Sequence, residues 1–269
     1  MPVSEQNQLD FKLIVDAANA AGQIGMKWFG NDPKVWMKEG QSPVSEADFA
    51  IDQFLKQQLL EARPDYGWLS EETDDDGERL KADRVFVVDP IDGTRGFINH
   101  MKRWCISIAV VERRRPVVAV LECPVMKQTI SAHKDHGAWC NGAKIKAKNV
   151  EADTPLRVTG PRSFQSEVDN DWPRPIEKLP FVPSLAYRLA MIAMGEADLS
   201  LARPSAKDWD LAAADLIVHE AGAALTDLNG EQLTYNCKDV RHGGLVSSKS
   251  DCHTEMLDLA RKAINKRRN

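Results

Sequence analysis

A six-residue string with two carboxylates three positions apart is the clearest chemical feature of the sequence. This string, Asp89–Thr94 (DPIDGT), directly follows the apolar run Val85–Val88. Its proline disfavours helix at Asp89, and Gly93 permits a close approach by a ligand. Two carboxylates on such a rigid turn can bind one hard cation, and Mg²⁺ prefers oxygen ligands and often bridges to a substrate phosphate. An acidic turn that only closes a strand is the alternative, because Asp and Gly are common turn formers.

Two more acidic positions lie in distant parts of the chain. Glu71, followed by Glu72, comes after a short apolar segment, and Asp210 stands where a helix is predicted to begin. Each has an ordinary structural explanation, since a Glu-Glu pair is usually solvated and an Asp at a helix start is usually an N-cap. Carboxylates gathered from three segments would repel one another without cations. A metal centre built from them is therefore predicted to be locally unstable when it is empty.

Alternating helices and strands are predicted to position these carboxylates. Apolar residues at helical spacing predict a first helix from Phe11 to Met26 and a second from Ser45 to before Pro64, separated by a linker over residues 30–43. The predicted core face of the second helix is Phe49, Ile51, Phe54 and Leu59. Further helices are predicted at Leu185–Met194, Leu211–Ala221 and Cys252–Lys266. Apolar runs predict strands at Tyr66–Ser70, Arg84–Asp89, Trp104–Glu112, Val117–Leu121, Thr129–His133, Leu156–Thr159, Leu199–Ala202 and Gly243–Ser248.

The order of these elements predicts an α/β protein with layers of helices and sheets. The region around residues 145–155 is the predicted boundary between two halves. Residues 1–150 would form an N-terminal α+β half that carries Glu71 and the Asp89–Thr94 string. Residues 151–269 would form a C-terminal α/β half that carries Asp210.

Composition argues against several classes of protein. With 269 residues and a net charge of −5, the chain lacks the basic character that binding to a nucleic acid polymer usually needs. Its five cysteines form no Cys-x-x-Cys pair, so neither a zinc site nor a disulfide framework is expected, and scattered thiols fit a reducing cytoplasm. Residues 1–10 show no signal-peptide pattern, and no apolar run approaches the ~20 residues that cross a membrane. We therefore expect a cytoplasmic protein with no membrane partner.

The acidic motifs, taken together, resemble those of the inositol monophosphatase family. Glu71-Glu72, the Asp89–Thr94 string, Trp209-Asp210 and Glu220–Gly222 occur in the family's order and at similar separations, so the resemblance covers nearly the whole chain. It implies an α-β-α-β-α sandwich, usually a homodimer. It also implies hydrolysis of a small phosphate ester, with two or three Mg²⁺ ions in each active site.

The resemblance assigns the metal ligands position by position. Glu71, Asp89 and the Ile91 carbonyl would bind the first ion, and Asp89, Asp92 and Asp210 the second. Glu71 would also help to hold a third, loosely bound ion, and it is counted among the catalytic residues.

The resemblance also assigns the groups that contact phosphate and water. Gly93 and Thr94 would bind the phosphate through their backbone, and Asp48 and Thr94 would orient the attacking water. Asp48 has a second interpretation, because Ser45 and Asp48 have the spacing of a helix capping box. Lys38 falls in the family's basic position before the active site.

Departures from the inositol phosphatase pattern bear on the substrate. Arg203 stands six positions before Trp209-Asp210, where those enzymes carry an acidic residue that binds sugar hydroxyls. A cation there favours a second anionic group over a polyol. The stretch Arg95–Ile98, together with Cys123–Met126 and Arg162-Ser163, is more similar to the 3′(2′),5′-bisphosphate nucleotidase branch. Lys38, Arg95, Arg162, Ser163 and Arg203 are therefore the predicted substrate-binding residues. Inositol 1-phosphate and histidinol phosphate are the alternative substrates.

Two other classes of protein share part of this pattern. Haloacid-dehalogenase-type phosphatases also carry an Asp…Asp-Gly-Thr string, but one residue separates their aspartates and one aspartate becomes phosphorylated. Here two residues separate Asp89 from Asp92, which favours a pair of metal ligands. A binding protein that had kept the fold without catalysis would be expected to lose ligands, and every expected ligand is present.

Overall fold

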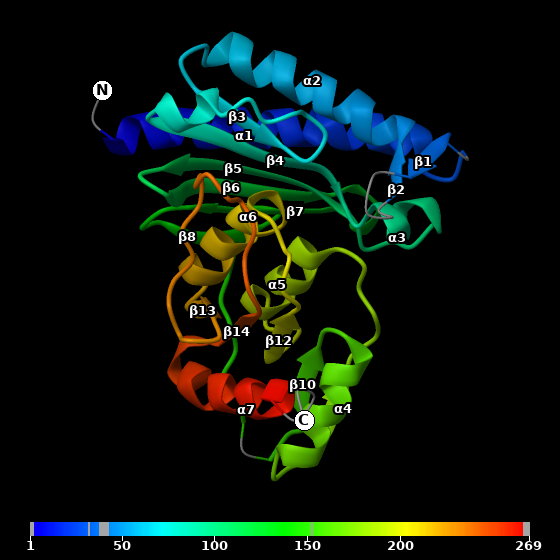
Figure 1. The fold of residues 1–269 in the computed structure, drawn as a ribbon, viewed down its shortest axis with the longest axis vertical. Coiled ribbons are helices and arrows are strands. Elements are labelled where there is room, and N and C mark those ends of the chain that lie inside the picture. Colours follow the sequence, from blue (N-terminus) through cyan, green and yellow to red (C-terminus); the bar gives the residue numbers. More distant parts are fainter. Residues whose placement is uncertain (1–2, 32, 38–42, 152, 266–269) are drawn as a thin grey trace.

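Five alternating layers of helices and strands make up the fold (Figure 1). The computed structural model describes residues 3–31, 33–37, 43–151 and 153–265. Two helices cover one face of a seven-stranded sheet, two lie between that sheet and a five-stranded sheet, and two cover the outer face of the second sheet. These pairs are α1 (Val3–Trp28) with α2 (Glu46–Ala62), α5 (Leu185–Ala193) with α6 (Asp208–Glu220), and α4 (Arg162–Asp171) with α7 (His253–Asn265). The predicted α-β-α-β-α sandwich is confirmed.

The seven-stranded sheet follows the chain from β3 to β9, with only β3 and β4 parallel. Its second strand, β4, is buried on both faces, with Val85 and Val87 toward α5 and α6 and Phe86 and Val88 toward α1 and α2. This period of two explains the uninterrupted apolar run. The strands are β3 (Gly67–Ser70), β4 (Arg84–Asp92), β5 (Cys105–Glu112), β6 (Arg115–Cys123), β7 (Gln128–His133), β8 (Gly137–Cys140) and β9 (Ala143–Ile145).

The five-stranded sheet has the order β11-β10-β12-β14-β13. Strand β10 is parallel to both of its neighbours, and β14 is antiparallel to β12 and β13. The strands are β10 (Leu156–Thr159), β11 (Ile176–Lys178), β12 (Leu199–Ala202), β13 (Ala223–Asp227) and β14 (Leu245–Lys249). In the sequence, the strands of the seven-stranded sheet come before residues 146–155 and those of the five-stranded sheet come after them. The division of the chain into two halves stays a prediction.

Shorter elements complete the chain, and two of them replace part of the predicted linker. Strand β1 pairs antiparallel with β2, so the predicted linker contains part of a two-stranded sheet. These elements are β1 (Val35–Met37), β2 (Pro43–Ser45), α3 (Thr94–Ile98), η1 (Glu78–Lys81), η2 (Pro124–Met126) and η3 (Ser250–Cys252). Among the described residues, no helix combines the length and the apolar character needed to span a membrane.

One apolar side chain that was predicted to face the core is exposed. Phe49 is 46% exposed and packs on the Trp36 ring, with 6.0 Å between the ring centroids. The predicted core residues Ile51 and Leu59 are buried, and Asp48 and Asp52 are buried on the same helix. Hydropathy alone does not predict the burial of these two side chains, because it places carboxylates outward.

Candidate active site

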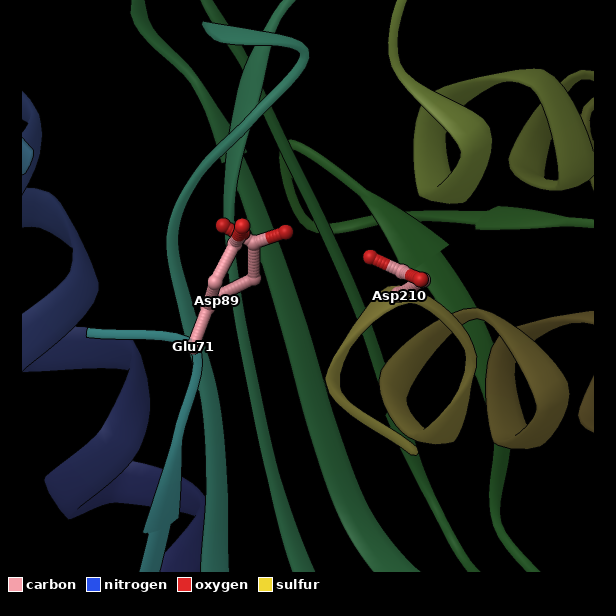
Figure 2. A group of neighbouring side chains, drawn as sticks. All are labelled: Glu71, Asp89 and Asp210. Atoms are coloured by element: carbon pink, nitrogen blue, oxygen red, sulfur yellow. The ribbon is translucent and has the colours of Figure 1, made fainter. Parts of the chain in front are cut away.

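Three carboxylates from three distant segments converge between the seven-stranded sheet and α6 (Figure 2). One oxygen each of Glu71, Asp89 and Asp210 lies within 4.8 Å of the other two. Glu71 directly follows β3, and its backbone N–H donates to the Val88 carbonyl at 3.2 Å, which holds it beside the end of β4. Asp210 reaches the other two from the first turn of α6. The structure therefore brings together three of the predicted metal ligands.

Burial and neighbouring negative charges make Asp89 and Asp210 hard to ionise in the protein alone. Asp89 is 1% exposed, and burial, with the charge of Glu71 as the next cause, raises its pKa well above the usual range. Burial and the charge of Asp92 raise the pKa of Asp210 to about 8. A set of carboxylate oxygens as close together as these fits a hard divalent metal ion. Asp210 is the third residue of α6 rather than its N-cap, and it accepts a hydrogen bond from the Lys207 N–H at 2.7 Å.

Asp92 lines the same cleft but turns its carboxylate to the start of α5. It accepts hydrogen bonds from the Ser184 hydroxyl and the Ala186 N–H at 2.6 Å each, and from the Leu185 N–H at 3.2 Å. Burial raises its pKa to about 6. Asp92 thus lies outside the group of three carboxylates, and it joins β4 to α5. A role as a metal ligand stays a prediction for this residue.

Asp48 and Thr94 form a polar pair at the edge of the acidic group. The Thr94 hydroxyl lies 3.1 Å from Asp48 Oδ1 and 3.0 Å from the Ile91 carbonyl oxygen, so it can donate to either. Asp48 Oδ2 accepts hydrogen bonds from the Ser45 N–H at 2.8 Å and from its hydroxyl at 2.6 Å. Burial raises the pKa of Asp48 to about 6. The capping interaction and the contact with Thr94 therefore exist together.

Two glycines let the loop before α5 pack directly against α3. Gly93 has φ +96°, and a Cβ there would lie 3.0 Å from the Ser184 backbone nitrogen. A Cβ on Gly96 would lie 2.3 Å from Pro183 Cγ. The first amides of a helix have no partner within it, so the start of α3 offers N–H groups beside the three carboxylates.

The predicted substrate-binding residues are spread over three neighbouring cavities. Arg95 lines a cleft of about 280 Å³ together with the acidic residues. Arg162 lines a second cavity that shares Phe181 with this cleft. Ser163 and Arg203 line a third groove, where the Arg203 guanidinium donates to the Ser163 hydroxyl at 3.2 Å. Lys38 lies outside the described residues.

Sequence reasoning missed Phe181 and Ser184. Both lie between predicted elements, in a loop without a motif, and only the pair of prolines in the Pro180–Pro183 segment marks a rigid connection.

Gly96→Ala should damage the site through the close packing between α3 and this loop. The new methyl group would overlap Pro183, so we expect the free energy of unfolding to fall by about 1–3 kcal/mol. We also expect kcat/KM to fall roughly tenfold or more, because the loop would move. Gly243→Ala is the matched control, because a Cβ there meets nothing within 4 Å. Thermal unfolding and steady-state kinetics of both variants measure the difference. Equal effects would show that the contact with Pro183 is unimportant.

The layered α/β fold and its cluster of carboxylate oxygens have the features expected of a metal-dependent hydrolase. A sequence model of the inositol monophosphatase family matches residues 6–265, and the chain belongs to this family. Members of the family are metal-dependent phosphatases, and this protein is a phosphatase.

Similar proteins differ in the substrates that their names record. A 3′(2′),5′-bisphosphate nucleotidase CysQ of Haemophilus influenzae is 29% identical over 231 residues, which cover 82% of this chain and 86% of the relative. A histidinol-phosphatase of Mycobacterium tuberculosis is 30% identical over 262 residues, which cover 92% of this chain and 96% of the relative. The structure of a Thermotoga maritima IMPase superposes with a TM-score of 0.82 at 23% identity, covering 96% of this chain and 98% of that one. The two sequence relatives are both named as enzymes that act on phosphate esters, and the solved structure shows the shared fold.

Proposed function

We propose that the protein is a Mg²⁺-dependent phosphomonoesterase whose reaction takes place in the cleft between β4, α3 and α6. The observation that carries this proposal is the convergence of Glu71, Asp89 and Asp210 within 4.8 Å. These residues would hold divalent cations, with the Ile91 carbonyl and Asp92 as further proposed ligands. Bound there, the cations would neutralise phosphate charge and lower the pKa of a water molecule.

The chain's own groups orient the reactants in this proposal. The phosphate would accept hydrogen bonds from the Gly93 and Thr94 amides at the start of α3. The Thr94 hydroxyl and Asp48 would position the attacking water, and Asp48 Oδ1 lies near enough to Thr94 to hold that hydroxyl in place. With a pKa of about 6, Asp48 is ionised at neutral pH and can accept a hydrogen bond from the water.

We further propose a 3′(2′),5′-bisphosphate nucleotide as the substrate. Arg95 at the cleft adds a cation beside the phosphate site, and a guanidinium binds a second phosphate better than a neutral ring of hydroxyls. Similarity to the CysQ nucleotidase also supports this choice. Histidinol phosphate is the second candidate because a histidinol-phosphatase is equally similar, and inositol 1-phosphate is the third.

A panel of phosphate monoesters tests both levels of the proposal. Phosphate release would be measured with Mg²⁺ and with a chelator, for adenosine 3′,5′-bisphosphate, histidinol phosphate and inositol 1-phosphate. We expect turnover only with Mg²⁺ and the highest kcat/KM for the bisphosphate. Turnover without metal would contradict the metal-dependent mechanism, and a different ranking would contradict the substrate alone.

Arg203→Glu should narrow the preference for the bisphosphate. The side chain is exposed and lies outside the acidic cleft, so solvent screens its charge. We therefore expect the ratio of kcat/KM for the bisphosphate to kcat/KM for inositol 1-phosphate to fall only roughly threefold to tenfold. Arg203→Gln removes the charge without reversing it and should give a smaller change. An unaltered ratio in both variants would show that Arg203 takes no part in substrate choice.

Assembly and location are also proposals. We propose a homodimer with two or three Mg²⁺ ions per active site, to be tested by light scattering and by metal titration of the purified protein. The five cysteines are unpaired in the structure, which supports a reducing location such as the cytoplasm.

A further inference from the structure

The cavity that adjoins the acidic cleft has the opposite electrostatic character. It has a volume of about 280 Å³, and its lining contains Arg162 and Lys178 but no carboxylate. Lys178 is already paired with Asp169 at 2.7 Å. Arg162 begins α4, and among the described residues no side chain or carbonyl group is bonded to its guanidinium. Arg162 is therefore the cation that this cavity offers to an anionic ligand.

Phe181 separates the two cavities and belongs to the lining of both. Its side chain is 56% exposed, while Val182 beside it is 1% exposed. One face of an aromatic ring is thus presented to solvent at the border between the acidic cleft and the basic cavity. Exposed apolar side chains are common, so position and rigidity must decide whether this one has a role.

The backbone that carries Phe181 is fixed on both sides. Before it, the Leu179 N–H donates to the Val158 carbonyl and the Leu179 carbonyl accepts from Gln165, both at 2.9 Å. After it, Pro183 packs on Gly96 of α3, and the Ser184 hydroxyl donates to Asp92. In Figure 1 this segment rises from the α4 layer to the start of α5, near α3. The backbone that carries the ring is therefore held at a set place relative to the phosphate site.

We propose that the leaving group of the substrate extends from the acidic cleft over the Phe181 ring into the basic cavity. A flat heterocycle of the leaving group would stack on the ring, and Arg162 would bind a second anionic group. This inference rests on the proposed phosphatase reaction in the acidic cleft. It identifies the features that the substrate must combine: a phosphate ester, a planar ring and a further anion. A bisphosphorylated nucleotide has all three. Histidinol phosphate has a planar ring but carries an ammonium group that Arg162 would repel, and inositol phosphate has no planar ring.

Substitutions at Phe181 test the stacking contact. Phe181→Ala should raise KM for adenosine 3′,5′-bisphosphate on the order of tenfold, because base stacking on an aromatic side chain contributes at about this level. KM for inositol 1-phosphate should change much less. Phe181→Trp should keep a low KM and Phe181→Leu should not, which separates stacking from apolar packing. Phe49→Ala is the matched control, since Phe49 is similarly exposed but lies on α2.

A substitution at Arg162 tests the second anion. Arg162→Gln should lower kcat/KM for the bisphosphate by about tenfold to a hundredfold, which is the usual range for one charge-assisted contact. It should also raise the inhibition constant of adenosine 5′-phosphate, which carries the ring and one anion. The exposed Arg113 in the turn between β5 and β6 supplies the matched control, Arg113→Gln.

The inhibition constant of adenosine 5′-phosphate separates failure of this inference from failure of the proposed function. A wild-type preference for the bisphosphate that survives Phe181→Ala and Arg162→Gln would overturn the inference and leave the function standing. Weaker inhibition in both variants without any wild-type preference would support the binding site and overturn the nucleotidase assignment. Unaltered inhibition and no preference would overturn both.

Discussion

Asp89→Asn is expected to reduce kcat/KM on the order of a thousandfold or more while leaving the fold intact. Asp89 is the buried member of the three-carboxylate group, and metal-ion stabilisation of phosphate charge is worth several kcal/mol. The amide oxygen of Asn can still accept the hydrogen bond that the Ile91 N–H donates at 3.0 Å. The substitution therefore removes a charge and little else. Phosphate release with saturating Mg²⁺ measures the loss.

Asp215→Asn is the matched control for this substitution. Asp215 is also a buried carboxylate, on the same helix as Asp210, but it pairs with Arg115 at 3.1 Å and with the Tyr235 hydroxyl. Losing it should destabilise the protein without a comparable loss of kcat in the folded fraction. Without metal, Asp89→Asn should unfold at a higher temperature than the wild type, because it relieves repulsion. An active Asp89→Asn enzyme would contradict the proposed metal site.

The second large effect concerns the metal-free protein, whose stability should fall as the pH rises from about 5 to about 8. The pKa of Asp210 is raised from 3.8 to about 8, so in this range the folded state binds a proton that the unfolded state has lost. This contribution to stability is fully present below the pKa that Asp210 has in the unfolded state. It is lost as the pH rises through the pKa that Asp210 has in the folded state. Asp48 and Asp92, with pKa values near 6, act in the same direction.

Mg²⁺ should reverse this trend, because bound cations favour the ionised carboxylates. We expect the rise in Tm on adding Mg²⁺ to grow with pH and to reach on the order of 5 °C near pH 8, a shift that corresponds to one or two kcal/mol in a chain of this size. His133 and His253 have lowered pKa values and act in the opposite direction, so Asp210→Asn is the necessary control. That variant should show a flatter pH profile and a smaller response to Mg²⁺. A metal-free wild type that became more stable with rising pH would contradict the prediction.

Several features could be predicted from the sequence because short segments of it determine them. The apolar run before Asp89 lies in β4, which continues to Asp92, and Gly93 and Thr94 lead directly into α3. Gly222, with φ +81°, follows the end of α6. The order of the acidic motifs along the chain was enough to assign the family, and the family match over residues 6–265 confirms it. Backbone preferences and motif spacing act locally, so they can be read without coordinates.

Only the tertiary structure decided which side chains meet. Asp210 lies 121 positions after Asp89, and packing of α6 against the seven-stranded sheet brings their carboxylates together. The engagement of Asp92 with α5 and the position of Phe181 depend on the same packing, across segments that share no motif. The buried face of α2 likewise combines the predicted core residues Ile51 and Leu59 with two carboxylates, Asp48 and Asp52. Hydrophobic periodicity predicts the apolar part of this face, whereas the carboxylates are buried because other segments supply their partners, Thr94 for Asp48 and Ser70 for Asp52.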